Sequence, residues 1–286
     1  MTNIDQFESV FKAALKTVFK HNPIDFRKAL VVTDLLESDA KAFGDKVRSF
    51  LEILEGRRKL IWRDVSGDEF QTVENLLNLV LKEPVDLICT YRNLHSTAWR
   101  WPYSLGSHLD VLTQHTAVPV IVFPHPRAGK ALEHAIENTD SVMAITSHLL
   151  SDHTLVNYGV EFTQTYGTLH LTHVDDRDTF ERYMEAISKI PSINTEIARE
   201  EIEKKLLDEA RDYIHSCREA LEKKKVSIKI KEIVTMGTRI EEYKKLIQKN
   251  KVDLLIMHTR DQDQLAMHGM VYPLAVELRD IPILLI

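Results

Sequence analysis

The two halves of this chain repeat one another. Three pairs of short segments match and occur in the same order in each half. The pairs are KALVVTDLLESD (28–39) with SVMAITSHLLSD (141–152), EPVDLICTYRN (83–93) with NKVDLLIMHTRD (250–261), and TAVPVIVFP (116–124) with RDIPILLI (279–286). A repeat of this kind predicts one structural unit formed twice. We therefore expect a tandem duplication, with a first domain at 1–126, a linker at 127–140 and a second domain at 141–286.

Each repeated segment contains a continuous apolar run rather than an alternation of apolar and polar residues. Such runs are typical of parallel strands that are covered by helices on both faces of their sheet. Helical periods lie between the runs; Val47, Phe50 and Leu54, for example, fall on one face of a helix. The alternation of strand and helix predicts an α/β fold in which two doubly wound parallel sheets are connected by right-handed crossovers.

We expect strands in both domains, with one more in the second. They are predicted at 29–34, 59–65, 85–90 and 119–123 in the first domain, and at 142–147, 168–174, 227–235, 252–257 and 282–286 in the second. The additional unit of the second domain is the strand TLHLTHV together with a long charged helix at about 194–225. The first domain lacks this unit and begins instead with a predicted helix at about 4–20.

The scarcity of glycine disfavours two large classes of nucleotide-binding protein. The chain has 9 glycines in 286 residues, less than half of the usual ~7%. No two of them lie closer than eight residues, and neither GxGxxG nor GxxxxGKS/T occurs. Dinucleotide-dependent dehydrogenases and P-loop NTPases need such clusters, so neither class is expected.

Charge and cysteine content limit the partners and the compartment. The net charge is −6, with 17 basic and 19 acidic residues up to Asp140 and 20 and 24 after it. Neither half therefore carries the basic field that nucleic acid or an anionic membrane needs. The two cysteines, Cys89 and Cys217, lie in apolar segments and are expected to be buried, inert thiols. No apolar run approaches the ~18 residues of a membrane span and the N-terminus is too polar for a signal peptide, so a cytoplasmic protein is expected.

The order of these elements resembles that of the universal stress proteins, in the tandem form that fuses two domains. That family's domain opens with a strand ending in aspartate, as KALVVTD does here, and its second strand reads much like TLHLTHVDD. Its fourth strand opens with VDLI, and a proline leads its last strand. The resemblance covers about 28–286. It implies two adenine nucleotide alpha hydrolase-like domains that pack as an intramolecular pseudo-dimer, about a pseudo-twofold axis, through their final strands.

The family's ATP-binding members place a loop after the fourth strand, with the pattern Gly-x-x-Gly, about nine residues, then Gly-Ser or Gly-Thr. In the first domain Gly106 and Ser107 match the end of this loop, thirteen residues before Pro119. Asp34 matches the strand-end aspartate that contacts the nucleoside in those members. The resemblance thus implies a nucleotide site at Asp34, Gly106 and Ser107.

The two earlier glycines of the loop are absent from the first domain. Aligned from the strand, Tyr91 and Leu94 stand in their places; aligned from Gly106, Asn93 and Ser96 do. Glycines matter there because a backbone without Cβ can approach phosphate oxygens and turn its N–H groups toward them. The first domain therefore retains half of the site.

The second domain departs further from the pattern. Gly269 keeps the spacing to its proline, but His258 and Asp261 replace the first two glycines, and Ser147 replaces the strand-end aspartate. Asp261 would also repel a triphosphate. We expect this second site to be lost for ATP.

The residues expected to meet at the carboxyl ends of the first domain's strands leave two alternatives open. Gly106 and Ser107 can present helix N–H groups to a small anion or to ATP or AMP, with Tyr91, Arg92 and Asn93 alongside. The other alternative is that Ser107 is simply an N-cap and Gly106 a turn residue. Arg92, or Arg100 in the same loop, would supply a guanidinium to the anion.

Metal binding and catalysis have weaker support. His148, His173, His258 and His268 are expected at the equivalent edge of the second domain, where three imidazoles can hold zinc. No HExxH or CxxC spacing supports this, so polar surface histidines are the simpler interpretation. No GxSxG elbow and no acid–base pair is found, and no catalytic residue is assigned.

The expected function is therefore a non-catalytic role in stress response or regulation, with degenerate nucleotide sites. Two alternatives stay open. One is ATP or AMP binding in the first domain, with slow ATP hydrolysis or adenylate sensing. The weaker one is metal binding by the histidines of the second domain.

Overall fold

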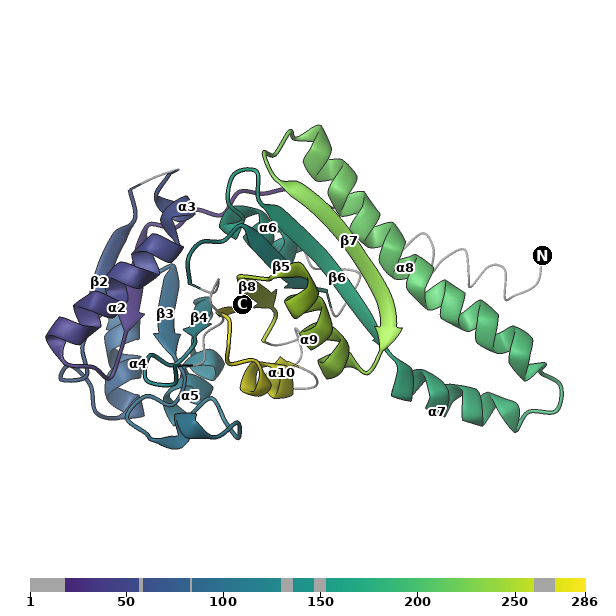
Figure 1. Ribbon diagram of the computed structural model, residues 1–286, viewed down its shortest axis with the longest axis horizontal. Coiled ribbons are helices and arrows are strands. Elements are labelled where there is room, and N and C mark those ends of the chain that lie inside the picture. Colours follow the sequence, from purple (N-terminus) through teal and green to yellow (C-terminus); the bar gives the residue numbers. More distant parts are fainter. Residues whose placement is uncertain (1–18, 57–58, 83, 130–135, 147–152, 260–270) are drawn as a thin grey trace.

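The computed structural model describes residues 19–56, 59–82, 84–129, 136–146, 153–259 and 271–286 (Figure 1). In this part of the chain, helices flank one large, mostly parallel sheet, so the predicted α/β class is confirmed. The predicted helix at 4–20 lies outside the described residues except for its last two positions. The predicted linker at 127–140 lies partly outside them.

The sheet of the described residues has nine strands in the order β2-β1-β3-β4-β9-β8-β5-β6-β7. The strands are β1 (Lys28–Val32), β2 (Ile61–Val65), β3 (Leu87–Tyr91), β4 (Val120–Phe123), β5 (Ser141–Ile145), β6 (Thr168–Asp176), β7 (Lys229–Gly237), β8 (Leu254–Met257) and β9 (Ile283–Leu285). Each predicted strand is present, with ends that differ by no more than two residues. The central runs are buried throughout, as expected for strands covered on both faces.

The two final strands meet at the centre of the sheet. β4 and β9 pair antiparallel, with Val120 opposite Leu285 and Val122 opposite Ile283, whereas the other neighbouring strands pair in parallel. The predicted contact between the closing strands is therefore present. Two separate sheets were expected, whereas this pairing joins the nine described strands into a single continuous sheet.

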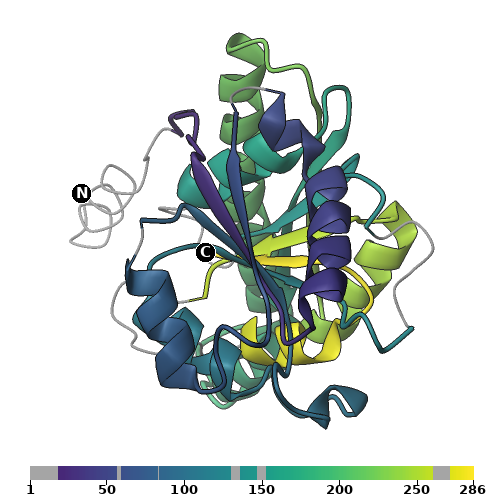
Figure 2. The ribbon, with the colours of Figure 1, turned by 90° about the vertical axis from the view of Figure 1, so that its left-hand side faces the viewer.

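Helices connect the strands and cover the sheet on both sides (Figure 2). The described helices are α2 (Glu37–Phe50), α3 (Glu52–Glu55), α4 (Val73–Lys82), α5 (Ser107–His115), α6 (His153–Phe162), α7 (Arg177–Ser188), α8 (Thr195–Lys223), α9 (Arg239–Asn250) and α10 (Val271–Glu277), with a 3-10 turn η1 (Ala98–Arg100). α4 packs against α5, and α3 packs against α6. Cys89 and Cys217 are buried, as expected, and neither forms a disulfide within the described residues.

The repeated Val-Asp-Leu motif has the same structural role in both halves. The carboxylate of Asp86 accepts the backbone N–H groups of Arg27 and Lys28 at 2.8 and 2.9 Å, at the start of β1. The carboxylate of Asp253 accepts the N–H of Ser141 at 2.8 Å, at the start of β5. Each aspartate satisfies a donor that the beginning of the neighbouring strand would otherwise leave unpaired. Asp253 is buried, and this burial raises its pKa to about 7.

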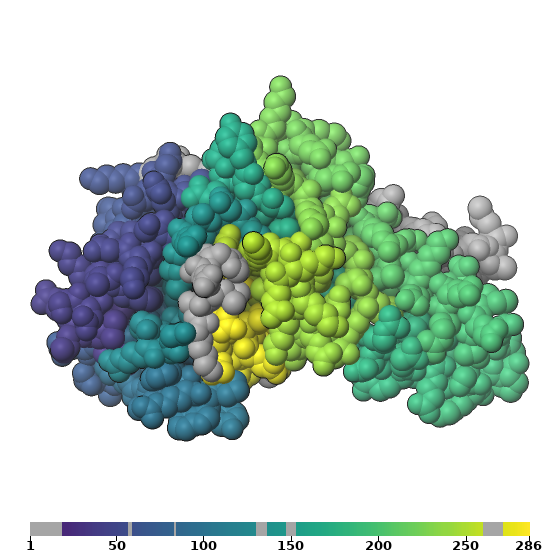
Figure 3. Space-filling view, in the orientation of Figure 1, coloured from purple at the N-terminus to yellow at the C-terminus, as the bar shows by residue number. Residues whose placement is uncertain are grey.

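The second half has one strand more than the first, but this strand is not β6 (TLHLTHV), as predicted. β6 pairs with β5 as β2 pairs with β1, so the strand without a counterpart is β7, at the edge of the sheet. Phe180 and Met184 of α7 pack with Met236 of β7 in a hydrophobic cluster separate from the main core. The Asp176 carboxylate caps the N-terminus of α7, and the Asn194 side chain caps that of α8. Figures 1 and 3 show α7 and the adjoining end of α8 projecting at the right of the molecule. The predicted long helix is confirmed, and only its later part packs on the main core.

Candidate functional site

Asp34 follows β1 at the carboxyl edge of the sheet, where its carboxylate is held by two groups of the protein itself. One oxygen accepts a hydrogen bond from the Tyr91 hydroxyl, and the other accepts the backbone N–H of His95 at 2.9 Å. The N–H of Asp34 in turn donates to the Tyr91 hydroxyl oxygen at 3.1 Å. Burial, reinforced by the bond to Asp34, raises the pKa of Tyr91 well above its ordinary value. The structure thus brings Asp34 and Tyr91 together, and their side chains are hydrogen-bonded to each other.

The segment after β3 folds back on itself at Asn93. The backbone N–H of Asn93 donates to the carbonyl of Leu105 at 2.7 Å, and the side-chain amide of Asn93 donates to the carbonyl of Ser104 at 3.3 Å. Asn93 and His95 both have positive φ, 60° and 55°. Asparagine tolerates this left-handed conformation better than most residues, which explains its presence at this turn.

Gly106 is required by packing against Asn93. Its φ is +95°, and a Cβ at this position would lie 2.7 Å from the Asn93 Cα. No side chain fits in that space, so Gly106 has a structural role whether or not a phosphate ever approaches it. Glycine at this point therefore does not by itself indicate a nucleotide loop.

The N-terminus of α5 differs from the simple capping interpretation. Gly106 is the N-cap and Ser107 is the first helical residue, so the interpretation of Ser107 as the N-cap is wrong. Among the described residues, no side chain forms a capping hydrogen bond there, and Ser107 is exposed. The first N–H groups of α5 consequently lack the side-chain acceptor that serine, threonine or aspartate usually supplies.

Arg92 does not join the other site residues. It is buried, and its guanidinium donates to the carbonyl oxygens of Val276, Ala275 and Leu278 at 2.8, 3.1 and 2.7 Å. These carbonyls lie at the C-terminal end of α10, in the other half of the chain. Burial, with a smaller effect of the Arg279 charge, lowers the pKa of Arg92 to about 10, so the group remains charged at neutral pH. Nη1 and Nη2 of Arg92 thus donate to the end of α10 rather than to an anion near Gly106.

Aromatic rings surround this site, and two of them, Phe70 and His125, were not expected from the sequence. The His125 ring lies 4.8 Å from the Tyr91 ring and stacks on Trp99 at 4.6 Å, between ring centroids. Phe70 lies 4.9 Å from His95 and 5.8 Å from His108. The sequence contained one signal for His125, which stands between two prolines directly after the β4 run and hence at the carboxyl edge.

His125 is neutral at physiological pH. It is buried, and this burial lowers its pKa to about 4. Its Nδ1 accepts the N–H of Arg127 at 3.1 Å, which places the ring proton on Nε2. Within the described residues, this site therefore brings together one shielded carboxylate, a tyrosine hydroxyl bonded to it, and a neutral imidazole.

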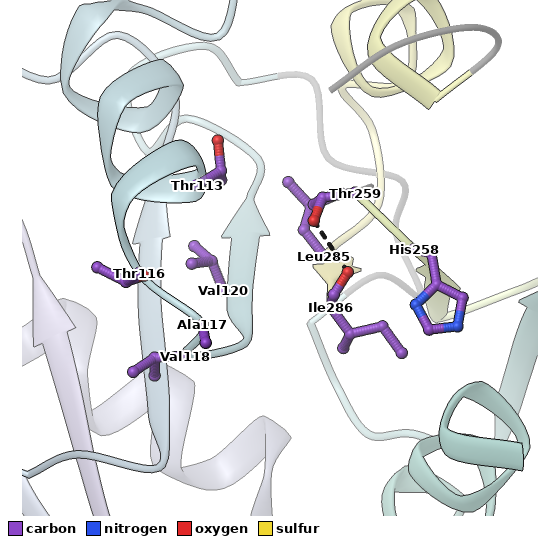
Figure 4. Close-up of a pocket in the computed structure, with 9 residues that line it drawn as sticks. All are labelled: Thr113, Thr116, Ala117, Val118, Val120, His258, Thr259, Leu285 and Ile286. Carbon is purple, nitrogen blue, oxygen red and sulfur yellow. Dashed lines mark hydrogen bonds between the residues drawn. The ribbon is translucent and has the colours of Figure 1, made fainter. Parts of the chain in front are cut away.

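The second half is described only in part at the corresponding edge. Ser147, Asp261 and Gly269 lie outside the described residues. His258 directly follows β8 and lines a cavity of about 310 Å³ between β9 and the end of α5 (Figure 4). Beside it, Thr259 donates its hydroxyl to the carbonyl of Ile286 at 2.9 Å. The cavity is lined by residues of both halves.

The histidines considered for a metal do not form a site in the described part of the chain. Among the described residues there is no group of three or more histidine, cysteine, aspartate or glutamate side chains that could hold a metal ion. His173 is buried, with Nδ1 at 2.7 Å from the Thr146 carbonyl and Nε2 at 3.4 Å from Asp175. His148 and His268 lie outside the described residues.

Comparisons with known proteins bear on the fold. No protein-family model matches the chain, and no curated protein matches it. The solved structure of a functionally unknown protein from Pseudomonas aeruginosa PAO1 is similar at 12% identity and a TM-score of 0.50, over 91% of this chain and 92% of that one. That likeness shows the fold alone. A universal stress protein from Archaeoglobus fulgidus DSM 4304 is similar at 10% identity and a TM-score of 0.43, over 91% of this chain and 85% of that one.

The described helices also bear on membrane insertion. Among them, none is at once long enough and apolar enough to cross a membrane.

Proposed function

We propose that this chain is a non-catalytic regulatory protein of the universal stress type, built from two fused domains related by a pseudo-twofold axis. Two observations support the duplication. Read outward from the β4–β9 pair, the order β4, β3, β1, β2 corresponds to the order β9, β8, β5, β6. Asp86 and Asp253 make equivalent bonds at equivalent strands. Two copies packed on their closing strands would produce this arrangement.

The observation that carries the proposal is the engagement of Asp34 within the protein. In a nucleotide site of the family's kind, this carboxylate would face the nucleoside. Here its two oxygens accept from Tyr91 and from the His95 N–H. A nucleoside would have to displace both groups, and the space beside Gly106 is filled by Asn93. Loss of both hydrogen bonds at a half-buried carboxylate opposes nucleotide binding.

Titration calorimetry with ATP and with AMP, in the presence of Mg²⁺, tests the proposal. We expect no binding heat, no nucleotide extracted from the purified protein, and no phosphate release above the buffer rate. Tyr91→Phe is the informative variant, because it frees one carboxylate oxygen and leaves the ring in place. Micromolar binding by the wild type that disappears in Asp34→Asn would contradict the proposal.

A second candidate is a small anion or AMP at the N-terminus of α5. It is favoured by the absence of a side-chain cap on that helix. Thermal stability against phosphate and AMP, for the wild type and for Ser107→Glu, tests it. The introduced carboxylate would stabilise the helix itself and compete with the anion, so ligand stabilisation should be confined to the wild type. Identical, ligand-independent melting curves would exclude this candidate.

A further inference from the structure

Three arginines from separate segments of the chain meet around Trp99. The Arg100 guanidinium lies over the indole ring, with Cζ 5.5 Å from its centroid. Arg279 donates from Nη1 to the Trp99 carbonyl at 3.5 Å. Arg127 lies beside His125, which stacks on Trp99 with the ring planes 15° apart. The backbone N–H of Arg127 donates to His125 Nδ1 at 3.1 Å, and the Arg127 charge adds to the effect of burial in lowering the pKa of His125. We call Arg100, Arg127 and Arg279 the arginine cluster.

The arginine cluster is a local excess of positive charge on an acidic molecule. Within the described residues, none of its three members forms an ion pair with a carboxylate. Of the nearby acidic groups, Asp34 is held by Tyr91 and His95, and Asp280 is exposed. The chain as a whole has a net charge of −6. Positive charge concentrated against this background favours an acidic partner at this one place.

Exposed aromatic side chains border the arginine cluster. Trp101 is 51% exposed and Tyr103 is 79% exposed, and both follow Arg100 in the same loop. Tryptophan, tyrosine and arginine are the residue types that supply most of the binding energy at protein interfaces. In Figure 2 a turn in the blue of residues near 100 stands out at the lower end of the molecule. A projecting surface fits a macromolecular partner, whereas small ligands bind in concave sites.

We propose that the arginine cluster, together with Trp101 and Tyr103, is a docking site for an acidic segment of a partner protein. Carboxylates of that segment would pair with the guanidinium groups, and its apolar side chains would pack on the two exposed rings. Nucleic acid fits less well, because both halves of the chain are acidic and would repel a long polyanion beyond the cluster. This inference goes beyond the proposed function, and it does not depend on whether nucleotide binds.

Fluorescence anisotropy tests the docking site, with the full chain and a fluorescein-labelled peptide of alternating glutamate and leucine. We expect saturable binding that weakens as salt is added, because exposed charges are screened. Arg100→Gln/Arg127→Gln/Arg279→Gln should bind roughly 10-fold or more weakly. Its circular dichroism spectrum and melting temperature, compared with those of the wild type, establish that the variant is folded.

The control is Arg27→Gln/Arg182→Gln/Arg211→Gln, which makes the same change of charge at exposed arginines on other elements. It should bind as the wild type does. Trp101→Ala/Tyr103→Ala alters only exposed side chains and no charge, and it should also weaken binding. The proposal is overturned by the absence of saturable binding to the wild type, or by equal losses in the two triple variants. Tighter binding of inorganic tripolyphosphate or of an oligothymidylate than of the peptide also overturns it.

Discussion

Replacing Arg92 with methionine should destabilise the whole protein, because Arg92 of the first half holds the end of α10 in the second. Its three hydrogen bonds come from a charged donor, and each such bond contributes about 1.5–3 kcal/mol. Against this stands the cost of burying the guanidinium. The lowering of its pKa from 12.5 to about 10 corresponds to roughly 3 kcal/mol.

The net effect expected for Arg92→Met is a loss of roughly 2–5 kcal/mol in the free energy of unfolding, since methionine fills the space but leaves three carbonyls without donors. Such a loss lowers the melting temperature by about 5–15 °C in a protein of this size. Urea titration followed by circular dichroism measures the first quantity, and calorimetry the second. Arg92→Lys should recover little, because one ammonium group cannot reproduce the fork of donors.

Arg63→Met is the matched control. Arg63 pairs with Glu69 at 3.0 Å, with both side chains more than one-third exposed, and such a pair contributes ~0–1 kcal/mol. If Arg92→Met loses no more stability than this control, the guanidinium does not hold the two halves together, and the reasoning fails.

Two further predictions concern a glycine and a buried carboxylate. Gly106→Ala should lower the free energy of unfolding, measured by urea titration, by about 1–3 kcal/mol, because φ is +95° and the added Cβ would meet Asn93. The control is Gly129→Ala, where φ is +58° and nothing lies within 4 Å of the added Cβ; it should lower the same quantity by about 1 kcal/mol or less. Asp253 has a folded pKa raised to about 7 by burial, so the folded state keeps a proton that the unfolded chain releases, and stability falls as the pH rises from about 4 to about 7. Asp253→Asn keeps the acceptor for the Ser141 N–H and removes this slope; above pH 7 it should exceed the wild type by up to about 4 kcal/mol in unfolding free energy. If the unfolding free energy of Asp253→Asn depends on pH as that of the wild type does, groups other than Asp253 cause the dependence.

The strands of the repeated segments (β1, β3, β4, β5, β8 and β9) could be predicted from the sequence because each is a short, mostly apolar run. The β4 run after Pro119 and the β9 run after Pro282 have the same form, and the contact predicted between these two closing strands is confirmed. Local composition is informative for elements of this kind, since burial on both faces imposes it.

The site was harder to predict, because its contacts join positions far apart in the chain. Arg92 stands beside the presumed loop in sequence, yet its partners lie more than 180 residues away at the end of α10. Tyr91 was expected to obstruct a glycine position, but nothing in the sequence shows that its hydroxyl reaches Asp34. Glycine at 106 was interpreted through phosphate, whereas a contact with the Asn93 backbone is sufficient reason for it.

The antiparallel β4–β9 pair also sets an order of events during synthesis. β4 ends at Phe123 and β9 begins at Ile283, so the edge of β4 has no partner strand until about 160 further residues have been made. At ~5–20 residues per second, translation leaves that edge open for roughly 10–30 s. An unpaired apolar edge is a template for pairing with another chain. The edge of β4 in the nascent first half is therefore open to such pairing until the chain's own last strand emerges.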